Sequence, residues 1–72
     1  MFEPKNLIRH KRCLDLDLII QKVVNETIYG ITMDVSFYNR HYKTLMWTTP
    51  ETVFIRYEDY NNWEIVEENF YE

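Results

Sequence analysis

Residues 31–38 alternate between apolar and polar side chains, and this period of two constrains the fold more than any other feature. Such an alternation places one set of side chains on each face of a β-strand. The only glycine of the chain, Gly30, comes just before this stretch, and the polar residues 39–42 follow it. We therefore predict a central strand with a turn at each end. Its buried face carries Ile31, Met33, Val35 and Phe37, and its solvent face carries Thr32, Asp34, Ser36 and Tyr38.

A second apolar stretch, residues 14–24, alternates at first and then loses the pattern at Ile19 and Ile20. A β-bulge or a sharp bend in one long strand accounts for both halves. A helix over the same residues is the alternative, because Leu14 and Leu18 are four residues apart. The other expected elements are strands at 7–10, 43–47, 52–56 and 63–66, a hairpin loop at 39–42 and a one-turn 3₁₀ helix at 57–62.

The composition favours strands and a core built from large side chains. The 72 residues include twelve aromatic residues, one glycine and no alanine. An aromatic side chain buries roughly 150–250 Å², so a few of them close a small core. Five or six short strands at near-regular spacing are typical of a small closed or half-open barrel, which removes exposed sheet edges. We expect one domain over residues 1–66 and an acidic tail over 67–72.

Charge is distributed unevenly along the chain. Residues 1–12 carry a net charge of +3, residues 13–50 carry −1 and residues 51–72 carry −6, which together give the −4 of the whole chain. One end is therefore basic and the other acidic, and the two ends offer surfaces of opposite sign.

The sequence predicts a cytoplasmic protein. The single cysteine cannot form an internal disulfide and fits a reducing compartment. Residues 1–4 lack the charged and apolar regions of a signal peptide. The apolar run 14–24 is too short and too charged to span a bilayer, so we expect no membrane partner.

The order of these elements resembles the small SH3-like barrels. The strand at 7–10, the long bent strand after it, the central hairpin and residues 57–66 carry the resemblance, because a 3₁₀ turn commonly precedes the last strand in that architecture. The layout is also similar to that of small phage and bacterial proteins. The resemblance implies a module that binds a partner across an aromatic groove, and a phage accessory protein would act on a host complex in the host cytoplasm.

No catalytic, metal or cofactor site is expected. The only serine, Ser36, has no nucleophile-elbow context. Cys13 lies beside Arg12 in the sequence, but a free cysteine is more often a small hydrophobic residue than a nucleophile. His10, Cys13 and His41 give three ligands where a structural zinc ion requires four. One glycine excludes a glycine-rich phosphate loop. We expect a non-enzymatic protein without a cofactor.

Nucleic-acid binding is the alternative function. Basic side chains near the N-terminus would meet phosphates, and the tip of the central hairpin places two cations among aromatic residues that stack on bases. The net charge of −4 opposes this function. The candidate residues are Arg9, Lys11, Arg12, Arg40 and Lys43.

Protein binding is the main expectation, because the chain has more aromatic residues than a core of this size encloses. Tyrosines at turns or on the outward phase of strands, beside carboxylates, suit a basic or proline-rich peptide or a folded partner that presents arginines. A second copy of the chain is another possible partner. The candidate residues are Tyr38, Tyr42, Tyr57, Glu58, Asp59 and Tyr60.

Overall fold

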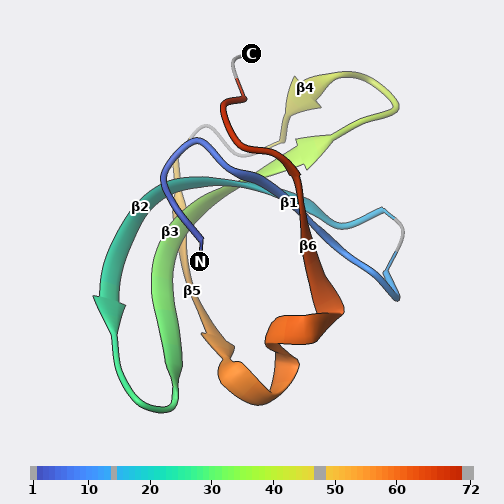
Figure 1. The fold of residues 1–72 in the computed structure, drawn as a ribbon. Helices are drawn as coiled ribbons and strands as arrows, with labels where there is room; N and C mark the ends of the chain where they lie inside the picture. The colour runs from blue at the N-terminus through green and yellow to red at the C-terminus, as the bar shows by residue number, and fades with distance from the viewer. Residues whose placement is uncertain (1, 14, 47–48, 71–72) are drawn as a thin grey trace.

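The described part of the chain folds into six antiparallel strands and one 3₁₀ helix. The computed structural model describes residues 2–13, 15–46 and 49–70. The all-β class, the six strands and the 3₁₀ helix before the last strand are confirmed. The elements are β1 (Leu7–His10), β2 (Asp17–Glu26), β3 (Gly30–Asn39), β4 (Thr44–Leu45), β5 (Glu51–Arg56), η1 (Tyr57–Asn62) and β6 (Trp63–Glu67), shown in Figure 1.

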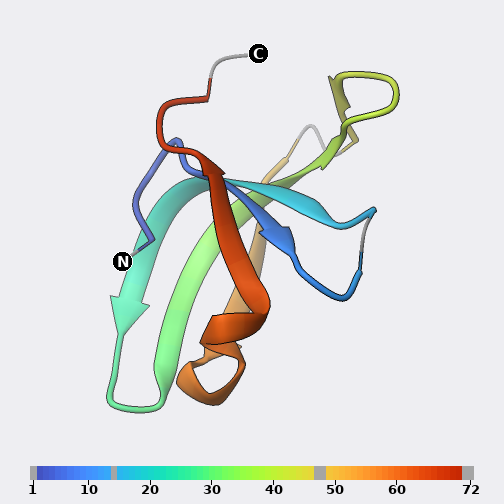
Figure 2. The same cartoon turned by 45° about the vertical axis from the view of Figure 1, so that its right-hand side comes forward.

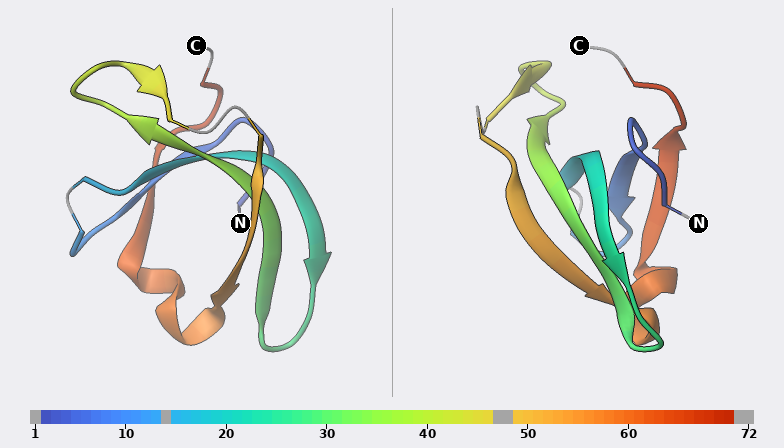
Figure 3. Two further views of the ribbon diagram at one scale, coloured as in Figure 1. Left: turned by 180° about the vertical axis from the view of Figure 1, so that it is seen from behind. Right: turned by 90° about the vertical axis from the view of Figure 1, so that its left-hand side faces the viewer.

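The strands form one strongly curved sheet with two edges. Its order is β4-β3-β2-β1-β6, and β5 pairs with the first part of β3. Within the described ranges no pairing joins β5 to β6, so the sheet is half-open and not closed. The right-hand view of Figure 3 shows β5 and β6 on opposite sides of the molecule, with η1 joining them at the bottom.

β2 is a strand with bulges that begins at Asp17, so residues 17–24 do not form the alternative helix. Leu14, where that helix was expected to begin, lies outside the described residues. Its register on β3 shifts between Ile20 and Lys22 and again between Val23 and Asn25. The first shift immediately follows Ile20, at the place where the alternation of the sequence breaks. A bulge inserts an extra residue and bends the strand, which curves the sheet around its core.

The core lies on the concave face, where the predicted inward side chains of β3 meet those of β1, β2 and β5. Ile31, Met33 and Val35 are fully buried, and Phe37 is half-buried. Phe2 reaches this core from the N-terminal segment and stacks on Tyr60 of η1, with 4.7 Å between ring centroids. The main core cluster comprises Phe2, Ile8, Leu18, Ile20, Ile31, Met33, Val35 and Ile55.

A second, smaller cluster on the opposite face changes the prediction for β3. Tyr38 is only 8% exposed and Ser36 only 3%, so their expected exposure to solvent is wrong. Tyr38 packs with Leu7 and Ile19, and the ring of Phe70 covers it at a centroid distance of 4.9 Å. Tyr38 is therefore buried between residues of the neighbouring strands and the C-terminal segment, which folds back over it.

The C-terminal segment is attached to the N-terminal turn. The amide of Phe70 donates to the carbonyl of Lys5 at 2.9 Å, and Asn6 Nδ2 donates to the carbonyl of Glu68 at 3.0 Å. Glu67 is the last residue of β6. Of the expected tail 67–72, residues 71–72 lie outside the described part of the chain.

The central hairpin is displaced by one residue from its expected position. Asn39 pairs with Thr44, so the loop comprises residues 40–43, and β4 has two residues where we expected a strand over 43–47. Asn39 Oδ1 accepts hydrogen bonds from the amides of His41 and Tyr42, which stabilises the turn. Residue 47 lies outside the described residues.

Candidate functional site: an aromatic hollow

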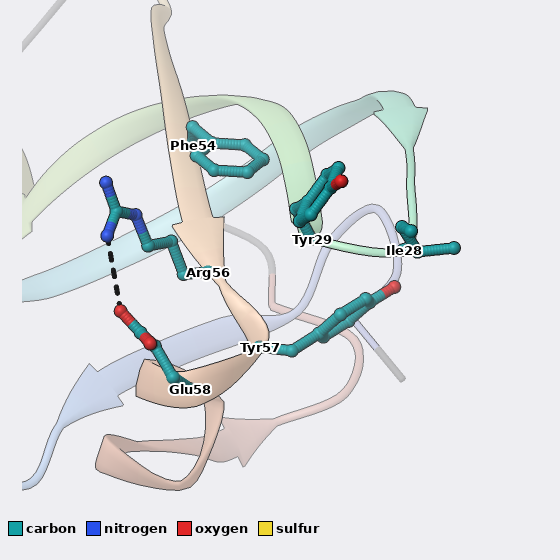
Figure 4. Close-up of a pocket in the computed structure, with 6 residues that line it drawn as sticks. All are labelled: Ile28, Tyr29, Phe54, Arg56, Tyr57 and Glu58. Carbon is teal, nitrogen blue, oxygen red and sulfur yellow. Dashed lines mark hydrogen bonds and ion pairs between the residues drawn. The ribbon is translucent and has the colours of Figure 1, made fainter.

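A surface hollow of about 540 Å³ lies where the β2–β3 turn meets the end of β5 (Figure 4). Three segments that are distant in sequence contribute to it: the turn, β5 and the start of η1. A volume of this size is within the range of ligand pockets. This hollow is lined by Ile28, Tyr29, Phe54, Arg56, Tyr57 and Glu58.

Gly30 allows these segments to approach each other. It pairs with Arg56 across β3 and β5, and the Tyr57 amide extends the pairing by donating to the Tyr29 carbonyl at 3.0 Å. A Cβ atom at position 30 would collide with the carbonyl oxygen of Ile55 and lie 2.8 Å from Cζ of Phe54. Glycine is therefore required for the close approach of β5, and the Phe54 ring lies over the space that a side chain would fill.

The lining side chains are unusually exposed for their size. Ile28 is 84% exposed, Tyr29 72% and Phe54 50%. Single exposed apolar residues are common on protein surfaces, but a contiguous group around a concavity is typical of binding sites. The hollow therefore combines a concave surface with exposed large apolar side chains.

Carboxylates lie beside the aromatic rings. Desolvation, followed by the charge of Glu26 and a hydrogen bond to it, raises the pKa of Tyr57 above its ordinary value. At the rim, Arg56 Nη1 lies 3.2 Å from Glu58 Oε1. Both side chains of this ion pair are about two-thirds exposed (66% and 70%), so the pair contributes little to stability.

Two of the predicted protein-binding residues, Tyr57 and Glu58, line the hollow. Asp59 is exposed on η1 next to them. Tyr60 is half-buried, and its ring centroid lies 6.2 Å from that of Tyr57. The structure thus brings the η1 candidates together at one end of the sheet.

The other two predicted protein-binding residues lie away from the hollow. Tyr38 is buried beneath Phe70, so it presents no ring to a partner. Tyr42 is 79% exposed in the turn after β3. Figure 2 shows that this turn and the β2–β3 turn are at opposite ends of the molecule, so Tyr42 forms no single site with Tyr57.

The nucleic-acid candidates Arg9 and Arg40 are engaged by aspartates. Arg9 donates from Nε and Nη2 to the two carboxylate oxygens of Asp17, at 2.9 and 3.1 Å. The Asp17 side chain is only 1% exposed, and its hydrogen bonds raise the pKa of Arg9 above the ordinary value. Arg40 lies 3.9 Å from both Asp15 and Asp17.

His41 completes this group, with Nε2 3.2 Å from Asp15 Oδ1. We call Arg9, Asp15, Asp17, Arg40 and His41 the charged end. Its cations are balanced by its own carboxylates, which reduces the positive potential offered to phosphates. The remaining candidates, Lys11, Arg12 and Lys43, are exposed.

The residues considered for chemistry have structural contacts. His10 Nδ1 accepts hydrogen bonds from the amides of Arg12 and Cys13, at 3.1 and 3.2 Å. The Ser36 hydroxyl accepts one from Gln21 at 3.2 Å. In the part of the chain that the structure describes, no three His, Cys, Asp or Glu side chains are arranged to hold a metal ion.

Four residues that line the hollow are not among the six predicted protein-binding residues: Ile28, Tyr29, Phe54 and Arg56. A signal for Phe54 is present in the sequence, because it lies between the apolar Val53 and Ile55 in the strand expected at 52–56. If those two side chains point inward, the residue between them must point outward. The proximity of β5 to the β2–β3 turn depends on strand register, which the sequence pattern does not specify.

No protein-family model matches the chain, and searches of curated proteins and of solved structures return no significant match. No helix among the described residues is both long enough and apolar enough to cross a membrane.

Proposed function

We propose that the protein is a non-catalytic interaction module that binds a segment of a partner protein in the hollow. The observation that carries the proposal is the aromatic lining contributed by Tyr29, Phe54 and Tyr57 from three segments of the chain. Tyr29 and Phe54 are exposed, and Tyr57 is half-buried. Tyrosine and other aromatic residues are enriched at protein interfaces, where they supply large contact area with little conformational entropy.

The architecture supports an SH3-like relation as part of this proposal. The half-open sheet and the 3₁₀ helix before the last strand follow the layout of those small barrels. The relation concerns only the order of the elements, and a shared fold does not by itself assign a function.

A matched pair of tyrosine variants tests the function. Tyr29 in the hollow and Tyr42 in the opposite turn are 72% and 79% exposed, so neither substitution by alanine disturbs the core. Peptides selected from a display library against the folded protein are then titrated against wild type, Tyr29→Ala and Tyr42→Ala. We expect Tyr29→Ala to weaken binding at least about tenfold and Tyr42→Ala to leave it unchanged.

Circular dichroism of both variants verifies the fold before binding is compared. A library that yields no binders would contradict the proposal. Binders that respond to Tyr42→Ala and not to Tyr29→Ala would also contradict it, because they would place the interface at the other end of the sheet.

A further inference from the structure

We propose that the hollow seats an arginine side chain of the partner segment, with the guanidinium group on the aromatic rings and paired with carboxylates. This inference rests on the proposed function and specifies its ligand. It commits to an extended segment that carries arginine, rather than to a proline-rich or purely apolar one.

The aromatic rings supply the first half of the recognition. Figure 4 shows the rings of Tyr29, Phe54 and Tyr57 arranged around one space, each from a different segment. A cation over an aromatic face is attracted by the ring quadrupole, by about 0.5–1 kcal/mol at an exposed site and more when water is excluded. The planar guanidinium also stacks on rings, which the ammonium group of lysine does not do.

The carboxylates supply the second half. Glu58 lines the hollow, and the negative charge of Glu26 acts on the Tyr57 hydroxyl and helps to raise its pKa. These two carboxylates and Arg56 carry a combined formal charge of −1. An apolar side chain would desolvate these carboxylates without a compensating partner, whereas a guanidinium would satisfy them.

The rim already contains a contact of the proposed kind. The guanidinium of Arg56 lies 3.2 Å from Glu58 in a pair that is mostly exposed. Such a pair is weak and screened by water, so an incoming arginine exchanges with Arg56 at little cost. The charge of −6 over residues 51–72 also attracts a basic segment over longer range.

Four short peptides that differ only in their central residue test the inference. The central residue is arginine, lysine, the neutral isostere citrulline, or leucine, and it is flanked by glycines. Binding is followed by amide chemical shifts of the whole folded chain. We expect the arginine peptide to bind in the millimolar range and to shift the amides of Tyr29, Gly30, Phe54 and Tyr57. The lysine peptide should have a lower affinity than the arginine peptide. The citrulline and leucine peptides should bind at least about fivefold more weakly than the arginine peptide.

A matched pair of charge variants locates the carboxylate contribution. Glu26→Gln removes the negative charge near Tyr57 and keeps an oxygen for its hydroxyl, whereas Glu51→Gln removes a charge at the far end of β5. We expect only Glu26→Gln to weaken the arginine peptide, by about two- to fivefold, and added salt to weaken it in wild type.

The outcomes separate this inference from the proposed function. A citrulline or leucine peptide that binds as well as the arginine peptide and is lost in Tyr29→Ala overturns the arginine assignment and leaves the interaction module standing. Absence of binding by the arginine peptide, or no effect of Glu26→Gln, also overturns the assignment. Display binders that ignore Tyr29→Ala overturn the function itself.

Discussion

The two ends of the curved sheet differ in how their side chains are satisfied. At the charged end, Asp17 receives two hydrogen bonds from Arg9 and has Arg40 3.9 Å away, while Phe70 covers Tyr38 nearby. At the hollow, large apolar side chains remain exposed around a concavity.

This difference shows that residue type alone does not make a site. Tyrosines and arginines occur at both ends. At the charged end the chain holds Arg9 on a buried carboxylate and covers Tyr38. At the hollow the Tyr29 ring and the Arg56–Glu58 pair stay mostly exposed. A binding surface results where the fold positions such groups and leaves their partners to come from another molecule. The exposure of the hollow supports its proposed role as such a surface, and the following predictions test the contrast between the ends.

Asp17→Asn should give the largest loss of stability. Removing one partner of a buried ion pair costs about 3–5 kcal/mol, and we expect the lower end of this range because the Arg9 side chain is 26% exposed. Asp15→Asn is the control, since its side chain is 81% exposed and should change the free energy of unfolding by less than about 0.5 kcal/mol. Urea unfolding measures both. Equal changes in the free energy of unfolding would show that the Arg9–Asp17 pair does not stabilise the fold.

Gly30→Ala should be the next most destabilising change, by about 1–3 kcal/mol, because the new methyl group meets the backbone of β5. The double variant with Phe54→Ala separates the causes. Removing the Phe54 ring relieves only the contact with a flexible side chain, and the collision with the Ile55 carbonyl oxygen remains. The double variant should therefore be no more stable than Gly30→Ala. Recovery in thermal unfolding would mean that the ring alone sets the requirement for glycine.

Phe70→Ala should cost about 1 kcal/mol, because it removes the edge-to-face contact with Tyr38 and part of the second cluster. Tyr42→Ala, at an exposed turn near the same end, is the control and should be nearly neutral. If Phe70→Ala left the unfolding free energy unchanged, the return of the C-terminal segment would have no energetic role.

Tyr57→Phe should reduce the loss of stability that wild type shows in alkaline solution. The pKa of Tyr57 is raised in the folded chain above its ordinary value of 10.0, so the unfolded chain releases this proton first. Wild type is then expected to lose stability as the pH rises above about 10, and Tyr57→Phe to lose less. Denaturant titrations below and above that pH measure the difference. Identical pH profiles of wild type and variant would show that neither desolvation nor the charge of Glu26 raises the pKa of Tyr57.

Much of the fold was predictable because strands leave a local signature. The alternation over 31–38 locates β3 and its buried face, and its failure at Ile20 locates the bulge in β2. The bounds of β1 and η1 follow from short patterns of the same local kind. The site was predictable only in part, through Tyr57 and Glu58.

The sequence by itself determined the period of each strand, the place of the bend and the uneven charge, because these depend on neighbouring residues. The tertiary structure alone decided which outward side chains stay exposed. Tyr38 is buried because Phe70 folds over it, and Phe54 meets Tyr29 because β5 pairs with β3 next to Gly30. The exposure of a side chain and its neighbours in space depend on contacts between distant segments, and a local sequence pattern does not specify those contacts.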